Sequence, residues 1–415
     1  MYYSSVKNFV DLQPILHCSR EEPGKGGSSA VKTLIELYDQ SPVENVRATL
    51  MFQPKEMILI CPPEQAEDRE FRRSMRDFFD RTQCPTRLSF VPVSLLDALK
   101  TEKVLREILD AHDDCAIDIS GGTDAALFAA GACSGEVGVF TYSRKKNTFY
   151  EIKNAPYARN LPCTVKLDVG SCLMMAGGYL LPGRADNAEL PGRFDEIDRL
   201  FRVYTRFRRE WNGQITYIQR ITSSGPEELE AEGNLREKSG GRTLRADPAL
   251  FRALEKEGLI LDLSIDGERI RFRFPDETVR FWLRDVGAVL ELHVFRACYE
   301  AGCFDDVVLS AVVNWQAGKL RSDSVSNEID VMAVQGIRPV FISCKACEVH
   351  TEALNELAVL RDRFGGKNAR AMLVTSGMTA RTRASTRMRA AKLGIELIEW
   401  ENISLDRLIS CLRRD

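Results

Sequence analysis

The feature that most constrains this chain is an alternation of short apolar strands and helical patterns between residues 31 and 152. Each apolar run ends at a turn or a proline, and a segment with apolar residues at helical spacing follows. Strands separated by helices predict a parallel, Rossmann-like sheet, because a parallel crossover needs a helix-length connection. The expected strands are 34–38, 57–61, 87–93 and 115–119, with 136–143 and 148–153 as a closing antiparallel hairpin.

A second block, residues 156–285, has less regular patterning. Its polar stretches at 182–193 and 221–245, rich in Gly or Pro, predict linkers or exposed loops. A helix pattern follows, and then two alternating strands joined at Asp266-Gly267, which is a strong hairpin signal. Helix plus hairpin predicts a small, winged-helix-like connecting region.

The third block begins with a helix pattern at 286–301 and continues in the order α-β-β-β-α-β-α-β. This order predicts a mixed sheet flanked by helices. The fold class is therefore α/β, and we predict three domains. They are a Rossmann-like domain at 1–155, a connector at 156–285 and an α/β domain at 286–415.

Composition excludes several classes of protein. There are 57 Lys and Arg against 60 Asp and Glu, a net charge of −3, which argues against a uniformly basic nucleic-acid binder but not against a local basic groove. No apolar run is long enough to span a membrane, and residues 1–5 do not begin a secretory signal. We therefore expect a cytoplasmic protein without disulfide bonds. The Cys344-x-x-Cys347 pair has no second such pair, and His350 is the one nearby histidine, so we do not expect a zinc site.

The first candidate site consists of two turns at the carboxyl ends of predicted strands. Gly121-Gly122 allows close approach of a ligand, and the following helix directs its N-terminus there, which favours phosphate or another anion. Ligands bind outside the carboxyl ends of strands in open parallel sheets, so both turns would line one crevice. The alternative is a tight connection without a ligand. The two turns contain Asp39, Gln40, Ser41 and Pro42, and Ser120, Gly121, Gly122 and Thr123.

The second candidate site is a predicted hairpin around residues 335–338. Side chains alternate between the two faces of a strand, so Glu328 and Asp330 share one face with Ser343 and Lys345. A four-residue loop places Asp330 opposite Ser343 and Glu328 opposite Lys345. Such a charged cluster is costly to bury unless it has a use.

Carboxylates are hard ligands suited to Mg²⁺ or Mn²⁺, which also hold a phosphate and an attacking water. Asp330 and Glu328 would supply two of them, and Glu291 on the preceding helix a third. Lys345 would orient or deprotonate the water, or neutralise charge on the phosphate. The alternative is a solvated face with a Glu328–Lys345 ion pair.

A third feature is basic. Residues 361–392 contain nine Lys and Arg against one acid, Asp362. A nucleic-acid backbone binds to such a patch, and the candidate contacts are Arg381, Arg383 and Arg387. The alternative is an ordinary solvated helix face.

At these residues a family resemblance is visible. Asp118-Ile119-Ser120-Gly121-Gly122-Thr123-Asp124 resembles the signature of CARF domains. The C-terminal block is similar to the PD-(D/E)xK, restriction-endonuclease-like domain. The similarity is carried by Glu291, by Asn327-Glu328-Ile329-Asp330-Val331 and by Ile342-Ser343-Cys344-Lys345. The two in this order resemble the CARF nucleases of type III CRISPR defence.

The resemblance implies a homodimer that binds cyclic oligoadenylate through residues 39–42 and 120–123, with cyclic tetra-adenylate as the first expectation. It implies a metal-dependent endonuclease for DNA or RNA, with Glu291, Asp330 and Lys345 as catalytic residues. Ser343 stands where the family has an acid, and Asp124 where it has a lysine.

Two other functions stay open. The chain could be a cyclic-oligoadenylate-sensing regulator with a degenerate nuclease domain, which Ser343 favours, or a nuclease that needs no activator.

Overall fold

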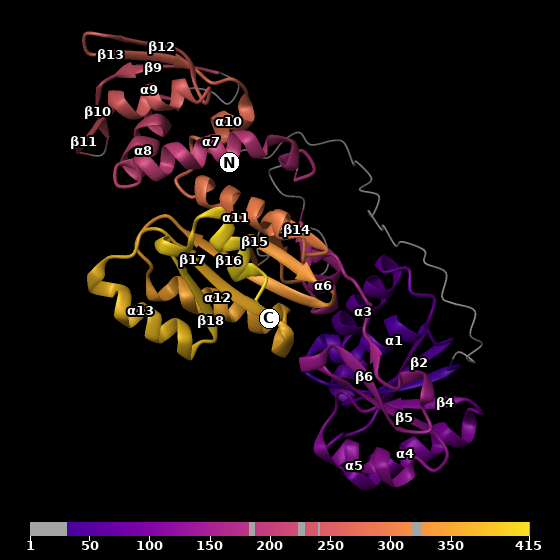
Figure 1. Ribbon diagram of the computed structural model, residues 1–415. Coiled ribbons are helices and arrows are strands. Elements are labelled where there is room, and N and C mark those ends of the chain that lie inside the picture. Colours follow the sequence, from indigo (N-terminus) through magenta and orange to yellow (C-terminus); the bar gives the residue numbers. More distant parts are fainter. Residues whose placement is uncertain (1–30, 182–186, 223–228, 240, 317–324, 415) are drawn as a thin grey trace. The chain divides into compact units, whose positions relative to one another are not determined.

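The computed structural model describes residues 31–181, 187–222, 229–239, 241–316 and 325–414. Parts of the predicted loops, at 182–186 and 223–228, lie outside these ranges. Figure 1 follows the described chain from its N-terminal sheet to its C-terminal sheet.

The N-terminal sheet has seven strands in the order β3-β2-β1-β4-β5-β6-β7, which confirms the Rossmann-like prediction. The first five are parallel, and β6 and β7 run antiparallel at one edge. The direction of strand order changes between β1 and β4, so the loops after these two strands lie at the switch point. The strands are β1 Thr33–Leu37, β2 Glu56–Cys61, β3 Arg87–Pro92, β4 Cys115–Asp118, β5 Gly138–Ser143, β6 Thr148–Lys153 and β7 Leu161–Pro162.

Helices connect these strands. The charged segment 64–81 forms two helices, because Asp68 is extended and caps the second by accepting hydrogen bonds from the Glu70 and Phe71 amides. Helices α4 and α5 pack against each other (Figure 1). The helices are α1 Arg47–Phe52, α2 Pro63–Glu67, α3 Arg69–Arg81, α4 Ala98–Ala111 and α5 Asp124–Cys133, and the 3-10 helix η1 Pro42–Asn45 precedes α1.

The middle region contains the helix and the hairpin that were predicted for a winged-helix-like module. A three-stranded antiparallel sheet, in the order β12-β13-β9, is accompanied by a separate hairpin of β10 and β11. The prediction of a loop at 221–245 is therefore wrong for residues 229–239 and 241–245, which contain three strands. The elements are α7 Phe194–Arg206, α8 Trp211–Ile221, β9 Glu230–Asn234, β10 Arg236–Ser239, β11 Arg242–Arg245, α9 Pro248–Lys256, β12 Leu261–Asp266, β13 Arg269–Arg273 and α10 Glu277–Trp282.

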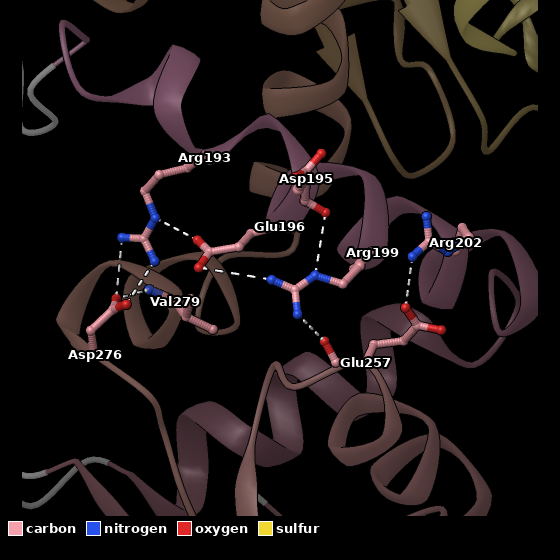
Figure 2. A network of polar contacts seen from close by, with 8 residues as sticks. All are labelled: Arg193, Asp195, Glu196, Arg199, Arg202, Glu257, Asp276 and Val279. Atoms are coloured by element: carbon pink, nitrogen blue, oxygen red, sulfur yellow. Dashed lines mark hydrogen bonds and ion pairs between the residues drawn. The ribbon is translucent and has the colours of Figure 1, made fainter.

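Ion pairs and hydrogen bonds connect the helices of this module (Figure 2). Arg193, just before α7, pairs with Asp276 at 2.7 Å, and Asp276 also caps α10. Arg199 donates to the Glu257 carbonyl at 2.7 Å, and Arg202 pairs with the Glu257 carboxylate at 2.8 Å. These contacts attach α7 to the end of α9 and the start of α10.

The C-terminal sheet has the order β18-β17-β16-β15-β14-β8. It confirms the predicted sequence of elements and adds a terminal helix, α14. Strand β8 comes from the predicted connector and pairs with β14. The elements are α6 Val169–Met175, β8 Tyr179–Leu181, α11 Ala288–Ala301, β14 Asp306–Asn314, β15 Ser326–Gln335, β16 Arg338–Lys345, α12 Thr351–Phe364, β17 Arg370–Thr375, α13 Ala380–Lys392, β18 Ile395–Glu399 and α14 Leu405–Leu412.

Two sequence expectations concern the whole chain. Among the described residues, no helix is both long and apolar enough to cross a membrane. The cysteines within these residues are free thiols, and Cys344 is buried.

Candidate active site and ligand-binding loops

The β15–β16 hairpin brings Asp330, Ser343 and Lys345 together. Val334 pairs with Pro339, which is the predicted register, although the turn is tighter than predicted because Gln335 and Arg338 also pair. One carboxylate oxygen of Asp330, Oδ2, accepts hydrogen bonds from Ser343 Oγ at 3.1 Å and from Lys345 Nζ at 3.3 Å. It also accepts one from the backbone N–H of Cys344, at 2.6 Å.

Glu291 lies on α11 in a strongly negative environment. Burial raises the pKa of its carboxyl, and the charges of Asp330, Asp285 and Glu328 raise it further, to about 8, against the opposing effect of Lys345. An added positive charge would therefore be favourable beside Glu291.

Lys345 is held as an ammonium group by Asp330. Burial alone would lower the pKa of Lys345, but the charge and hydrogen bond of Asp330 outweigh burial and raise it. The predicted alternative, a Glu328–Lys345 ion pair, is not among the contacts of the described residues. Lys345 pairs with Asp330 instead, and Glu328 is exposed.

A metal was predicted on Asp330, Glu291 and Glu328. Within the ranges that the structure describes, no group of three or more acidic, His or Cys side chains is gathered closely enough to hold a metal ion. The chemistry of Glu291 and Asp330 nevertheless fits a hard divalent cation, since both offer carboxylate oxygens and Glu291 stands among like charges.

The basic patch is less charged than its sequence indicates. Arg383 pairs with Glu399 at 3.2 Å, and Arg387 pairs with the same carboxylate. Glu401 is a further partner of Arg383, at 3.5 Å. These acids lie beyond the sequence window that was counted. Arg381 and Arg387 are both exposed, although Arg387 is paired with Glu399.

The first predicted ligand loop follows β1 and is fixed by its own polar groups. Asn45 Oδ1 accepts a hydrogen bond from the Asp39 amide at 2.7 Å, and the Asn45 side chain donates to the Asp39 carbonyl at 2.9 Å. The Ser41 amide donates to Asp39 Oδ1 at 2.7 Å. The Ser41 hydroxyl is buried without a hydrogen-bond partner in the structure.

The second predicted ligand loop follows β4 and touches the first. Asp118 Oδ1 accepts hydrogen bonds from the Ser120 amide, at 2.8 Å, and from its hydroxyl. A Cβ added at Gly121 would lie 3.0 Å from Asp39 Cβ, a tight contact, so glycine favours this close approach of the loops. Gly122 has a φ of +101°, which also favours glycine. Thr123 caps α5 by accepting from the Ala126 amide.

Sequence reasoning missed a buried cation beneath these loops. Arg47 donates to both carboxylate oxygens of Glu44, at 2.6 and 2.8 Å, and Arg144 donates to Glu44 at 2.8 Å. The Arg47 guanidinium lies 3.8 Å from the centre of the Tyr142 ring. The spacing of Glu44 and Arg47 is a weak signal for their pairing, but nothing local indicates Arg144.

Two buried carboxyls lie next to this network. Glu36 and Asp118 are register partners on β1 and β4. Burial raises the pKa of Glu36 well above its ordinary value, and the charge of Asp118 adds to this effect. Burial also raises the pKa of Asp118, to about 6, against the hydrogen bonds from Ser120.

A cavity of about 230 Å³ opens beside the first loop. Asp39, Gln40, Pro42 and Asn45 are among its lining residues. The second loop, 120–123, is not part of this lining.

Comparison with known proteins finds similarity to a domain family and to solved structures. Residues 276–410 match the family model of the Card1-like endonuclease domain. The chain is similar in structure to protein VC1899 from Vibrio cholerae, with a TM-score of 0.70 and 18% identity over 92% of this chain and 97% of that one. It is also similar to Can2 from Sulfobacillus thermosulfidooxidans, solved with cyclic tetra-adenylate, with a TM-score of 0.66 and 16% identity over 93% of this chain and 98% of that one. Comparison with curated protein sequences gives no match.

The two structural similarities extend over nine tenths of the chain and establish the fold. They confirm the predicted α/β fold, in which a parallel, Rossmann-like sheet precedes a C-terminal sheet flanked by helices. Residues 276–410 are thus similar to the Card1-like endonuclease domain, within a chain whose fold is similar to those of Can2 and VC1899.

Proposed function

We propose that this chain is a cyclic-oligoadenylate-activated nuclease of type III CRISPR defence, which cleaves phosphodiester bonds in DNA or RNA with Mg²⁺ or Mn²⁺. The contact between Lys345 and Asp330, inside a Card1-like endonuclease domain, is the observation that carries the proposal. An acid and a lysine on adjacent strands of the hairpin match the arrangement that the PD-(D/E)xK resemblance implies.

Glu291 and Asp330 would hold the metal ion, which would polarise the phosphodiester and lower the pKa of a bound water. The chain supplies the surroundings. Ser343 and the Cys344 amide fix the Asp330 carboxylate by donating hydrogen bonds to it. Lys345 adds a positive charge that would neutralise the negative charge developing on the phosphate.

The two loops at the switch point are the proposed site for cyclic oligoadenylate. Can2, which shares the fold, was solved with cyclic tetra-adenylate, and we take that compound as the first ligand to test. The N-terminus of α5, capped by Thr123, directs free amides toward the loop at 120–123. Asp39, Gln40 and Ser41 would complete the site.

A homodimer is the proposed assembly. Leu96, Leu99 and Phe128, before or on α4 and α5, are 81%, 79% and 72% exposed. Large apolar side chains that gather on one surface indicate a contact with another protein. A second copy of this chain is the partner that the CARF resemblance implies.

Replacing Lys345 by Ala tests this function. Cleavage of plasmid and single-stranded substrates with Mn²⁺ and cyclic tetra-adenylate should fall by about 100-fold or more, because a charge that stabilises the transition state is lost. The affinity for cyclic tetra-adenylate, measured by calorimetry, should stay within about twofold, because no ligand-loop residue changes. Lys55→Ala, at an exposed lysine before β2, is the matched control and should retain activity.

Full activity of Lys345→Ala would overturn the site assignment. A second candidate function is a sensing regulator with a degenerate nuclease domain, which Ser343 favours because serine is a poor metal ligand. Tight ligand binding by the parent chain, without cleavage under any metal, would support that function instead.

A further inference from the structure

The β10–β11 hairpin has one face that is entirely basic or neutral. Arg236 pairs with Arg245 across the hairpin, and Lys238 pairs with Thr243. Residues that are directly opposite in an antiparallel pair point to the same side. All four are exposed, so three cations and one hydroxyl share this outward face.

The other face of the hairpin holds it to the module. Glu237 pairs with Leu244, and Leu244 packs against the apolar core of the winged-helix-like region. The Glu237 carboxylate accepts hydrogen bonds from Asn234, so the acid of the hairpin is engaged on the inner side. The Gln214 side chain on α8 donates to the Arg245 carbonyl at 2.9 Å. The basic face is therefore carried on anchored backbone.

The three outward cations have no ion pair among the contacts of the described residues. The neighbouring strand β13 provides the contrast. Its exposed arginines are neutralised by acids of β9 and β12: Arg269 by Glu232 at 3.4 Å, Arg271 by Glu230 at 2.7 Å and Arg273 by Asp262 at 3.2 Å. The arginines of β13 are thus paired with acids, whereas the cations of the β10–β11 hairpin have no such partners among the described residues.

The spacing of these cations suits a polyanion. Residues two apart on a strand are separated by about 7 Å, and opposite residues by about 5 Å. A nucleic-acid strand carries one negative charge about every 3.4 Å along its axis, so the face spans about two phosphates. Helix α9 is a poor base reader here, because its exposed Arg252 and Lys256 are accompanied by Glu255. Contact with the backbone alone is what this chemistry supports.

We propose that the outward face of the β10–β11 hairpin, formed by Arg236, Lys238 and Arg245, binds the phosphodiester backbone of the nucleic-acid substrate without reading its sequence. The inference rests on the proposed nuclease function and adds a substrate-binding surface outside the endonuclease domain.

The test compares two triple variants with equal changes in charge. One replaces Arg236, Lys238 and Arg245 by Ala, and the control replaces Arg269, Arg271 and Arg273 by Ala. Both are made in the full chain carrying Lys345→Ala and are measured in EDTA, so that no substrate is cut. Binding is measured by fluorescence anisotropy with labelled duplex DNA, single-stranded DNA and single-stranded RNA. The salt concentration is varied from about 50 to about 200 mM, because affinity that depends on phosphate contacts falls steeply over this range.

The hairpin variant should bind about tenfold or more weakly at the lowest salt, and the slope of its log affinity against log salt should fall in magnitude by about two on duplex DNA. The control should stay within about twofold of the parent. The inference is overturned if both variants weaken binding equally, which would indicate bulk charge, or if neither does, which would assign the hairpin to another partner such as an acidic protein. Thermal unfolding checks that each variant is folded.

Cleavage by the chain with its native Lys345 separates this result from the proposed function. If the activated chain cuts nucleic acid while the hairpin variant binds as well as the parent, only the hairpin inference fails. If the parent neither binds nor cuts nucleic acid under any condition, both fail.

Discussion

At the residue scale, the candidate active site converges on one oxygen of Asp330. Its three donors come from three consecutive residues of β16, Ser343, Cys344 and Lys345. The two-residue period of a strand and the pairing of Val334 with Pro339 were sufficient to predict that the side chains of Ser343 and Lys345 share a face with Asp330. The backbone bond from Cys344 was not predictable, because the regular pairing of the strands ends at Val331 and Ile342.

Ser343 provides a test of the metal requirement. In Ser343→Asp, a carboxylate replaces the hydroxyl beside Asp330, and a hard anionic ligand binds Mg²⁺ more strongly. We expect the Mg²⁺ concentration for half-maximal cleavage to fall by about tenfold, a free-energy change of about 1.4 kcal/mol.

The measurement is the rate of nucleic-acid cleavage as a function of Mg²⁺ concentration, with cyclic tetra-adenylate present. In the control Ser343→Asn, the new side chain has nearly the same size as Asp but no charge. This variant should not lower the Mg²⁺ concentration needed for half-maximal cleavage. Equal titration curves for the Asp and Asn variants would contradict a metal ion beside Ser343.

At the scale of elements, long patterns were predicted better than short ones. The α/β alternation of both sheets was readable because buried parallel strands are continuous apolar runs. Strands β9 to β11 were not predicted. Of their residues, Ala231 alone is buried, and most exposed positions carry charged side chains. Such a pattern has too little apolar contrast to distinguish a strand from a polar loop.

Glu44 on η1 and Arg47 at the start of α1 form a buried ion pair. Arg47→Met keeps a long apolar side chain but leaves Glu44 buried with one partner fewer. Breaking a buried pair in this way costs about 3–5 kcal/mol of unfolding free energy. Urea unfolding followed by circular dichroism measures it. Arg159→Met removes an exposed partner of Glu151 and should cost about 1 kcal/mol or less.

The pH dependence of this pair has a definite sign. Burial would raise the pKa of Glu44, but Arg47 and Arg144 outweigh burial and lower it below its ordinary value of 4.5. The pair therefore stabilises the fold above that value and loses its effect as the pH falls through the folded-state pKa. The difference in unfolding free energy between the parent and Arg47→Met should be constant from about pH 7 to about pH 5. It should become smaller below about pH 5. A difference that grows on acidification would contradict the assigned ionisation.

At the scale of the whole molecule, the exposed apolar surface of α4 and α5 predicts self-association. Phe128→Asp places a charge where a partner surface would bury the ring, and burying an unpaired charge is strongly unfavourable. We expect the variant to be monomeric by light scattering and to bind cyclic tetra-adenylate at least about tenfold more weakly, since the ligand site of the proposed dimer is shared.

Met388→Asp is the matched control, because Met388 is also an exposed apolar side chain, 63% accessible, but lies on α13. It should leave the mass and the ligand affinity unchanged. A parent chain that is already monomeric with ligand bound would overturn the dimer.

Charge balance was the property that sequence windows predicted least well. The count over 361–392 omitted Glu399 and Glu401, which neutralise Arg383 and Arg387 in three dimensions. Glu44 and Arg144 are a hundred residues apart in the chain. Ion pairs form between whatever elements the fold brings together, and this information is not local.

Strand β8 shows that the boundary of the endonuclease match is not the boundary of a self-sufficient piece. Residues 276–410 include β14 but not Tyr179–Leu181, which occupy its outer side. A fragment cut at residue 276 would leave the main-chain groups of Val312–Asn314 unpaired, and an open strand of this kind is a template for aggregation. It would also lose α7, which packs on α11, the helix of Glu291. Strand β8 and helix α7 therefore complete the structure around the matched region, and a fragment that begins at residue 276 is expected to aggregate.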